Sequence, residues 1–161
     1  MASSGNFATM NPLIKTSNTM TYSFGNLRLG PPSSNFSSTD FCRSSMVIPK
    51  DKKIYAEIYA VAGSGGQHPI AVATTHAIPV GSIGGDGVVV LYENLKKVNG
   101  TTTSSWITTA AQGDVFQIAV DGATNKVWLG YNNTWGGSGN PSAGSNEAGT
   151  VNTSAALGFD L

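Results

Sequence analysis

The stretch GDVFQIAVDGATNKVWLGYNNTWGGSGNP, residues 113–141, determines the fold that we predict for this chain. It contains two apolar runs, residues 115–120 and Lys126–Tyr131, joined by a short polar link. Within each run, every second residue points to the same side if the run is a strand, and β-branched and aromatic residues are frequent. Both features favour strands over helices. Two such runs predict an antiparallel hairpin. Because an isolated hairpin is marginal in water, the stretch also predicts a wider sheet and a second layer.

Two aromatic residues of this hairpin are candidates for the core. Phe116 lies in the first strand and shares one face with Ile118 and Val120, because alternate residues of a strand point to the same side. Trp128 lies in the second strand. We expect Phe116 and Trp128 to lie on buried or partly buried faces of adjacent strands.

Further strands are predicted on the N-terminal side of the hairpin. Residues 19–23 and 27–29 flank a Phe-Gly-Asn turn and indicate a first hairpin. In Lys53–Tyr59 both alternating sets of residues contain apolar or aromatic side chains, which predicts a strand whose two faces are partly covered. Ile70–Thr74 and Val88–Tyr92 are short β-branched runs and are also predicted as strands.

Polar and glycine-rich segments are predicted as loops. Residues 96–105 form a polar segment that contains the turn signal Asn99-Gly100. The glycine-rich segments 63–67 and 81–87 lack the lysine and helix start of a phosphate-binding loop, so hairpin connections are expected there. Residues 136–149 are mostly Gly, Ser, Asn and Ala without periodicity, which predicts an exposed loop.

The composition limits the classes of function that need to be considered. The 161 residues suffice for one domain with a real core. Nine basic and nine acidic side chains give a net charge of zero, which argues against a nucleic-acid-binding surface. Only 11% of the residues are charged, and such a surface gives little protection against self-association.

The single cysteine and the apolar runs limit the compartment. Cys42 has no second cysteine to pair with, so we interpret it as a small buried residue. The first residues do not resemble a secretion signal. The longest apolar runs, residues 58–62 and Val88–Tyr92, are far too short to cross a bilayer. We therefore expect no membrane insertion, and a protein that is soluble or bound to a particle.

The central stretch resembles the core block of SPRY domains, which usually reads G-D-V-I-x-x-A-x-D followed by a turn and a strand that ends in Asn-Gly. The trailing Gly139-Asn140-Pro141 and the segment NPLIKTSN at residues 11–18 resemble the SPRY-like domains of tailed-bacteriophage virion proteins. This chain departs from the pattern at Tyr131-Asn132-Asn133, where Lys-Asn-Gly is usual, although Asn also tolerates the left-handed conformation. The matching residues are Gly113, Asp114, Val115, Ala119, Asp121, Trp128, Asn132, Trp135, Asn140 and Pro141.

The resemblance implies an all-β fold, an antiparallel two-sheet β-sandwich of the SPRY or concanavalin-like jelly-roll type. Residues 43–45 resemble the family strand that precedes Lys53–Tyr59. We expect an extended N-terminal arm at residues 1–18 and the sandwich at residues 19–161. The usual closing strands of the family are not recognisable, and residues 151–161 offer one last strand at most. Whether another chain completes the sandwich stays open.

No arrangement of residues suited to catalysis or metal binding stands out. His68 and His76 have no carboxylate at ligand spacing. The sequence contains no G-x-S-x-G nucleophile turn. It also lacks the E-x-D-x-E run that places two carboxylates on one strand face in sandwich glycanases. We therefore expect no catalytic residues, no metal, no cofactor and no enzymatic activity.

The best candidate for recognition is the turn after the second central strand. Tyr131, Asn132, Asn133, Trp135 and Asn140 place aromatic rings and amides close together, a combination that suits stacking and adaptable hydrogen bonds. We propose these five residues as a ligand- or partner-binding loop. The structural alternative is that Trp135 only plugs the end of the sandwich.

The resemblance and the missing chemistry lead to one expected function. We expect a non-enzymatic bacteriophage structural protein, located in the virion as a capsid decoration, head-fibre or tail-associated subunit. Its partners would be other virion proteins or copies of itself in a homo-oligomer, paired through residues 1–18 or 155–161. A receptor- or glycan-binding module of a tail fibre, which would bind a host surface glycan, is the alternative. A host-side adaptor that binds peptides is a third hypothesis.

Overall fold

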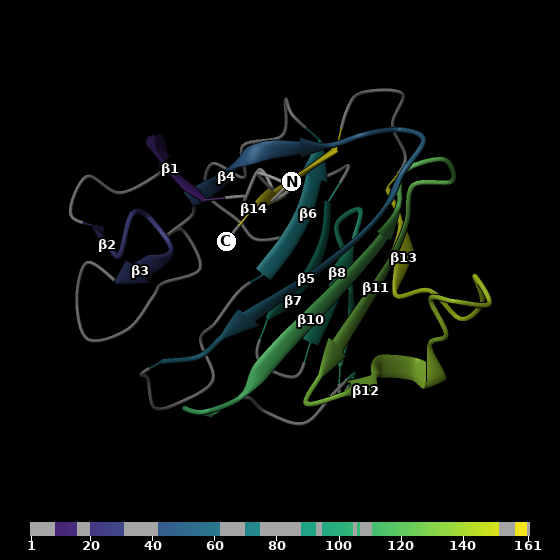
Figure 1. Cartoon of the computed structure of the whole chain (residues 1–161). Helices are drawn as coiled ribbons and strands as arrows, with labels where there is room; N and C mark the ends of the chain where they lie inside the picture. Colours follow the sequence, from purple (N-terminus) through teal and green to yellow (C-terminus); the bar gives the residue numbers. More distant parts are fainter. Residues whose placement is uncertain are drawn as a thin grey trace, which may run out of the picture.

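The computed structural model describes residues 9–15, 20–30, 42–61, 70–74, 88–92, 95–104, 106, 111–151 and 157–160. They form a seven-stranded sheet, a five-stranded sheet and a separate two-stranded hairpin, and all the strand pairs are antiparallel (Figure 1). The predicted all-β sandwich is therefore confirmed. The two glycine-rich segments 63–67 and 81–87 lie outside the described residues.

The five-stranded sheet contains the hairpin that the sequence predicts. Its order is β12-β11-β10-β5, and β13 also pairs with β11. The hairpin register runs from Phe116 opposite Tyr131 to Asp121 opposite Lys126 without a shift. The strands are β5 (Lys53–Tyr59), β10 (Val115–Asp121), β11 (Lys126–Tyr131), β12 (Thr134–Trp135) and β13 (Gly149–Thr150).

The seven-stranded sheet has the order β1-β4-β14-β6-β7-β8-β9. Its strands are β1 (Met10–Lys15), β4 (Cys42–Ile48), β6 (Ile70–Thr74), β7 (Val88–Tyr92), β8 (Leu95–Val98), β9 (Thr101–Thr103) and β14 (Leu157–Asp160). The predicted turn at Asn99-Gly100 is confirmed, since it joins β8 to β9. The predicted loop at residues 96–105 is wrong, because most of this segment forms two strands: β8 pairs with β7, and β9 pairs with β8.

The two ends of the chain correct the prediction about strand exchange. Strand β14 pairs with β4 on one side and with β6 on the other, so it lies inside the sheet of its own chain. The expectation that this C-terminal segment pairs with another chain is therefore wrong. Strand β1 pairs with β4, so part of the expected N-terminal arm belongs to the sandwich. Residues 1–8 and 16–19 lie outside the described residues.

The core lies between the two sheets. Phe116, Ile118 and Leu129 project from the five-stranded sheet, and the seven-stranded sheet contributes Ile48 and Val72. All five side chains are almost completely buried. Cys42 is also buried, as predicted, and its thiol donates to the carbonyl oxygen of Asn11 at 3.4 Å.

The segment after β12 covers the outer face of β11, although the sequence predicts an exposed loop there. It contains the short helix η1 (Gly136–Ser138) and a bridge between Asn140 and Ser145. The Trp128 indole Nε1 donates to the Ser145 carbonyl oxygen at 2.9 Å, and only 2% of Trp128 is exposed. The prediction that Phe116 and Trp128 are buried on adjacent strands is confirmed, and it is this segment that buries Trp128.

The hairpin predicted near the N-terminus is also confirmed. Strands β2 (Thr21–Ser23) and β3 (Arg28–Gly30) pair around the residues 24–27. The Met10 amide donates to the Asn26 carbonyl oxygen at 2.9 Å, which ties this hairpin to strand β1.

Candidate binding site

The predicted recognition loop begins with a tight turn between β11 and β12. Asn132 and Asn133 are its two central residues, with φ values of 44° and 64°. Positive φ at both central residues is the requirement of the type I′ turn of two-residue hairpins, and Asn adopts it at low cost. The turn that the sequence predicts is therefore kept, with Asn133 at the position where glycine is usual.

Both asparagines form hydrogen bonds within the chain. The Asn132 Oδ1 accepts a hydrogen bond from the Val115 amide at 2.9 Å, and its Nδ2 donates to Asp114 Oδ1 at 2.8 Å. The Asn133 amide N–H donates to Gln117 Oε1 at 2.8 Å, and Gln117 Nε2 donates back to Asn133 Oδ1 at 3.2 Å. These bonds fasten the turn to the start of strand β10.

Tyr131 lies on the inner side of the sheet. Its ring meets Phe116 edge to face, with ring centroids 6.2 Å apart, and packs against the core. Its hydroxyl donates to Asp114 Oδ2 at 2.6 Å. This bond to a carboxylate, together with burial, raises the pKa of Tyr131 to about 12. The structure therefore separates Tyr131 from Trp135, which lies on the outer face.

Removal of the Tyr131 hydroxyl gives a testable effect on stability. We expect Tyr131→Phe to lower the free energy of unfolding by about 1–2 kcal/mol, because one partly buried hydrogen bond to a carboxylate is lost. The pKa is raised on folding, so this stabilisation is fully present below the ordinary value of 10.0 and is lost as the pH rises through about 12. Urea titrations of both proteins should show their difference shrinking across that interval. A constant difference would exclude ionisation of Tyr131 as its source.

Trp135 is the one predicted site residue that lies beside a groove. It is half-buried and stands opposite Gly130, where a Cβ atom would lie only 2.9 Å from the indole. Its ring meets Tyr55 edge to face, with centroids 6.3 Å apart. The structural alternative that Trp135 plugs the end of the sandwich does not describe this position, because the ring covers the outer face of the sheet.

Tyr55 supplies the second aromatic wall of the groove and comes from strand β5. It stays 52% exposed. Its hydroxyl donates to Glu57 Oε1 at 2.5 Å and accepts from Gln117 Nε2 at 2.6 Å. Burial and then the bond to Glu57 raise the pKa of Tyr55. These two bonds hold the exposed ring in one orientation.

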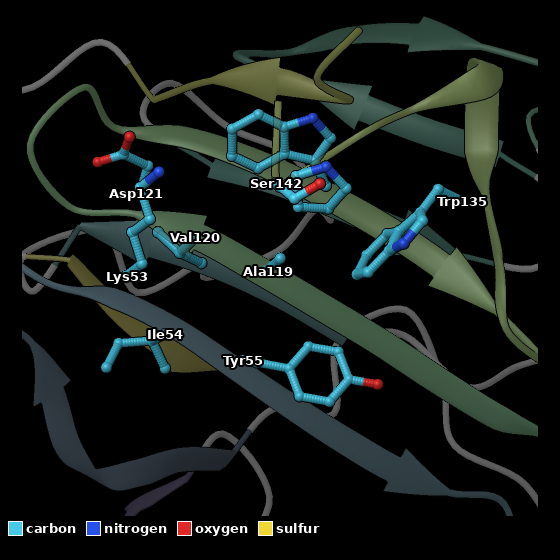
Figure 2. A pocket seen from close by; sticks show the side chains of 10 residues that line it. Lys53, Ile54, Tyr55, Ala119, Val120, Asp121, Trp135 and Ser142 are labelled. Atoms are coloured by element: carbon cyan, nitrogen blue, oxygen red, sulfur yellow. The ribbon is translucent and has the colours of Figure 1, made fainter. Parts of the chain in front are cut away.

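The groove has a volume of about 240 Å³ and opens on the outer face of the five-stranded sheet. Figure 2 shows Tyr55 and Trp135 on two sides of Ala119, with Ser142 on a third side. Lys53 and Asp121 lie at one end. The groove thus combines aromatic walls, a small apolar floor and charged groups at one end.

Asn140, the last predicted site residue, shapes the neighbouring loop. Its Oδ1 accepts hydrogen bonds from the Ser142 hydroxyl at 2.7 Å and from the Ala143 amide at 3.1 Å. It does not line the groove, whereas Ser142 does. Sequence reasoning missed Tyr55, and the available signal was its outward position in the alternating strand Lys53–Tyr59.

The described residues contain no group of three His, Cys, Asp or Glu side chains that could hold a metal ion. His68 and His76 are outside this part of the chain. Nor does any helix in the described ranges have the length and apolar character needed to cross a membrane.

Comparisons with known proteins show the fold and nothing finer. No family model matches the chain, and no curated protein matches it significantly. The SPRY domain of human HERC1 matches with a TM-score of 0.54 and 16% sequence identity, covering 75% of this chain and 72% of that one. At this identity the likeness concerns the fold alone. The chain therefore has a SPRY-like β-sandwich fold.

Proposed function

We propose that this chain is a non-enzymatic structural subunit of a tailed-bacteriophage virion, which binds copies of itself or neighbouring virion proteins. The observation that carries the proposal is the outer face of the five-stranded sheet, where Tyr55 and Tyr59 are 52% and 59% exposed. Exposed aromatic side chains on a rigid sheet are typical of contact surfaces. The phage-like segments at residues 11–18 and 139–141 support a place in the virion.

The spacing of Asp121, which lines the groove, and Glu57, which lies on the neighbouring strand β5, supports a role without catalysis. Glu57 stands opposite Gln117 and Asp121 stands opposite Lys53, so the two acids lie four residues apart along the sheet. That spacing corresponds to about 13 Å along a strand. Glycoside hydrolysis needs two carboxyl groups about 5–9.5 Å apart. The backbone positions of this pair are therefore farther apart than the two carboxyl groups of a glycosidase.

The virion assignment is tested on particles. Particles of a phage that encodes this sequence would be purified from a lysate on a density gradient and analysed by mass spectrometry. We expect the chain in the particle fraction at many copies per particle. Its absence from particles, with abundant chain in the surrounding lysate, would contradict the assignment.

Glycan binding by a tail fibre is the second candidate, and the groove between Tyr55 and Trp135 favours it. An aromatic ring offers an apolar face to a sugar, and the nearby Lys53 and Asp121 offer hydrogen bonds. If this groove binds sugars, the parent chain should give signals on a glycan array that Trp135→Ala abolishes. Tyr59→Ala is the matched control, because Tyr59 is exposed on the same strand as Tyr55 but does not line the groove. An array without signals would remove this candidate.

A further inference from the structure

The outermost strands of the two large sheets differ in how well their edges are protected. Strand β1 contains Pro12 and an irregular register between Asn11 and Lys15, while β9 has three residues and β12 has two. Proline, irregularity and shortness all hinder the addition of another strand. Strand β5 has seven residues and pairs with β10 without a shift. Among the described strands, β5 is therefore the long, regular edge.

The backbone groups of β5 that face this edge can be identified from its end. The Ala60 amide donates to the Asp114 carbonyl oxygen at 2.9 Å, and the Ala60 carbonyl accepts from the Gly113 amide at 2.9 Å. Hydrogen-bonding direction alternates along an antiparallel strand, so the even-numbered residues of β5 face β10. The odd-numbered residues point their N–H and C=O groups away from it. No described strand pairs with these groups.

The same odd-numbered residues also place their side chains outward. Lys53, Tyr55, Glu57 and Tyr59 are all exposed, whereas Ile54, Ala56 and Ile58 turn toward the core. No ion pair within the described residues engages Lys53 or Glu57. The edge thus offers backbone groups that no described strand pairs with, beside two exposed tyrosines and two opposite charges.

We propose that the β5 edges of two copies of this chain pair antiparallel about a twofold axis at Tyr55. The contact joins the two five-stranded sheets into one. This inference rests on the proposed function, because it assumes that the chain binds copies of itself. The axis places Lys53 opposite the partner's Glu57 twice and brings the two Tyr55 rings side by side. Opposite charges and aromatic pairs directly across an antiparallel pair are favourable.

The charges select this register over its neighbours. An axis at Glu57 would set the two Glu57 carboxylates opposite each other, and like charges there are unfavourable. An axis at Ala56 would set Lys53 opposite the partner's Tyr59 and lose both ion pairs. Charged edge residues often prevent strand pairing. In β5 the two charges are spaced so that a second copy satisfies both.

Charge reversal tests the contact in the full chain. By sedimentation velocity over a range of concentrations, the parent should form a dimer or a larger even-numbered assembly. Lys53→Glu and Glu57→Lys should each raise the Kd for association of the chain by about tenfold or more, because two attractive charge pairs become repulsive. The double variant K53E/E57K should restore association. Arg28→Glu makes the same charge change as Lys53→Glu, but on the separate hairpin, and should have no effect.

A backbone variant tests the edge independently of charge. Glu57→Pro removes an N–H that faces the edge and leaves the bonds to β10 in place, so it should abolish association. Glu57→Thr also removes the charge but keeps the N–H, and should associate more strongly than Glu57→Pro. Circular dichroism and melting temperature would verify that both variants fold.

The possible outcomes separate this contact from the proposed function. A parent chain that is monomeric at all concentrations overturns the β5 contact between copies. That holds also if a strand of another protein is later found to pair with this edge. An assembly that none of these variants weakens also overturns it, while the virion assignment stands if particles contain the chain. Association that follows the charge pattern supports the contact even if particles lack the chain.

Discussion

Replacing Trp128 with alanine is expected to lower the free energy of unfolding by about 3–5 kcal/mol. The side chain is only 2% exposed, and its indole N–H bonds the Ser145 carbonyl oxygen at 2.9 Å. Truncation would leave a cavity between strand β11 and the segment after β12, and it would leave that carbonyl without its donor. Both losses act on the same contact, so the effect should lie high in the range for large-to-small substitutions.

Urea denaturation followed by circular dichroism would measure this effect. Trp135→Ala is the matched control, because the same residue type on the same outer face is only half-buried. We expect the control to shift the denaturation midpoint by less than half as much. Equal midpoints for Trp128→Ala and the parent would contradict the position of Trp128 in the hairpin.

The sequence was most informative where local pattern and long-range pairing agree. In β10 and β11 the alternation of Phe116, Ile118 and Val120 and the β-branched content predict strands that the register then pairs without a shift. Strand β14 was placed wrongly, because its neighbours β4 and β6 lie far away in the sequence. No local pattern in four residues indicates whether they form an edge or a central strand.

The candidate site was predictable only in part, for a related reason. The Asn132-Asn133 turn was predicted because positive φ has a local residue signature. The direction of the side chains could not be predicted in this way, because it depends on how β10 pairs with β11. That pairing lets Asn132 bond Asp114 and makes Tyr131 face the core. The groove partner Tyr55 lies 80 positions before Trp135 in the sequence, and only the sheet brings the two together.

We expect self-association through the edge of β5 and not through a missing strand of the sandwich. The sequence suggested an incomplete sandwich, but β14 completes the seven-stranded sheet within the chain. Among the described strands, the long edge without a strand partner is β5 of the other sheet, beside the groove that Tyr55 lines. A strand partner at β5 and a ligand in the groove would therefore both contact Tyr55, so the two proposed interactions are expected to influence each other.

Replacing Gly122 with alanine is expected to lower the free energy of unfolding by about 3 kcal/mol. Gly122 is buried directly after β10, and its amide donates to the Lys52 carbonyl oxygen at 2.9 Å. A Cβ atom there would lie 2.1 Å from the Pro49 carbonyl oxygen. That oxygen is a backbone atom of the turn between β4 and β5, which connects the two sheets. Relief of the clash therefore requires movement of the β10–β11 turn against the β4–β5 turn.

Gly144→Ala is the matched control for this substitution. A Cβ atom at Gly144 would meet nothing within 4 Å, but its φ of +69° strains any residue with a side chain. That strain alone should cost about 1–2 kcal/mol. Thermal and urea denaturation should therefore rank Gly122→Ala as the more damaging of the two. Gly122 itself does not have a positive φ, so only the close approach to Pro49 opposes its substitution. A loss for Gly122→Ala that is no larger than that for Gly144→Ala would contradict the tight packing of the β4–β5 turn against the end of β10.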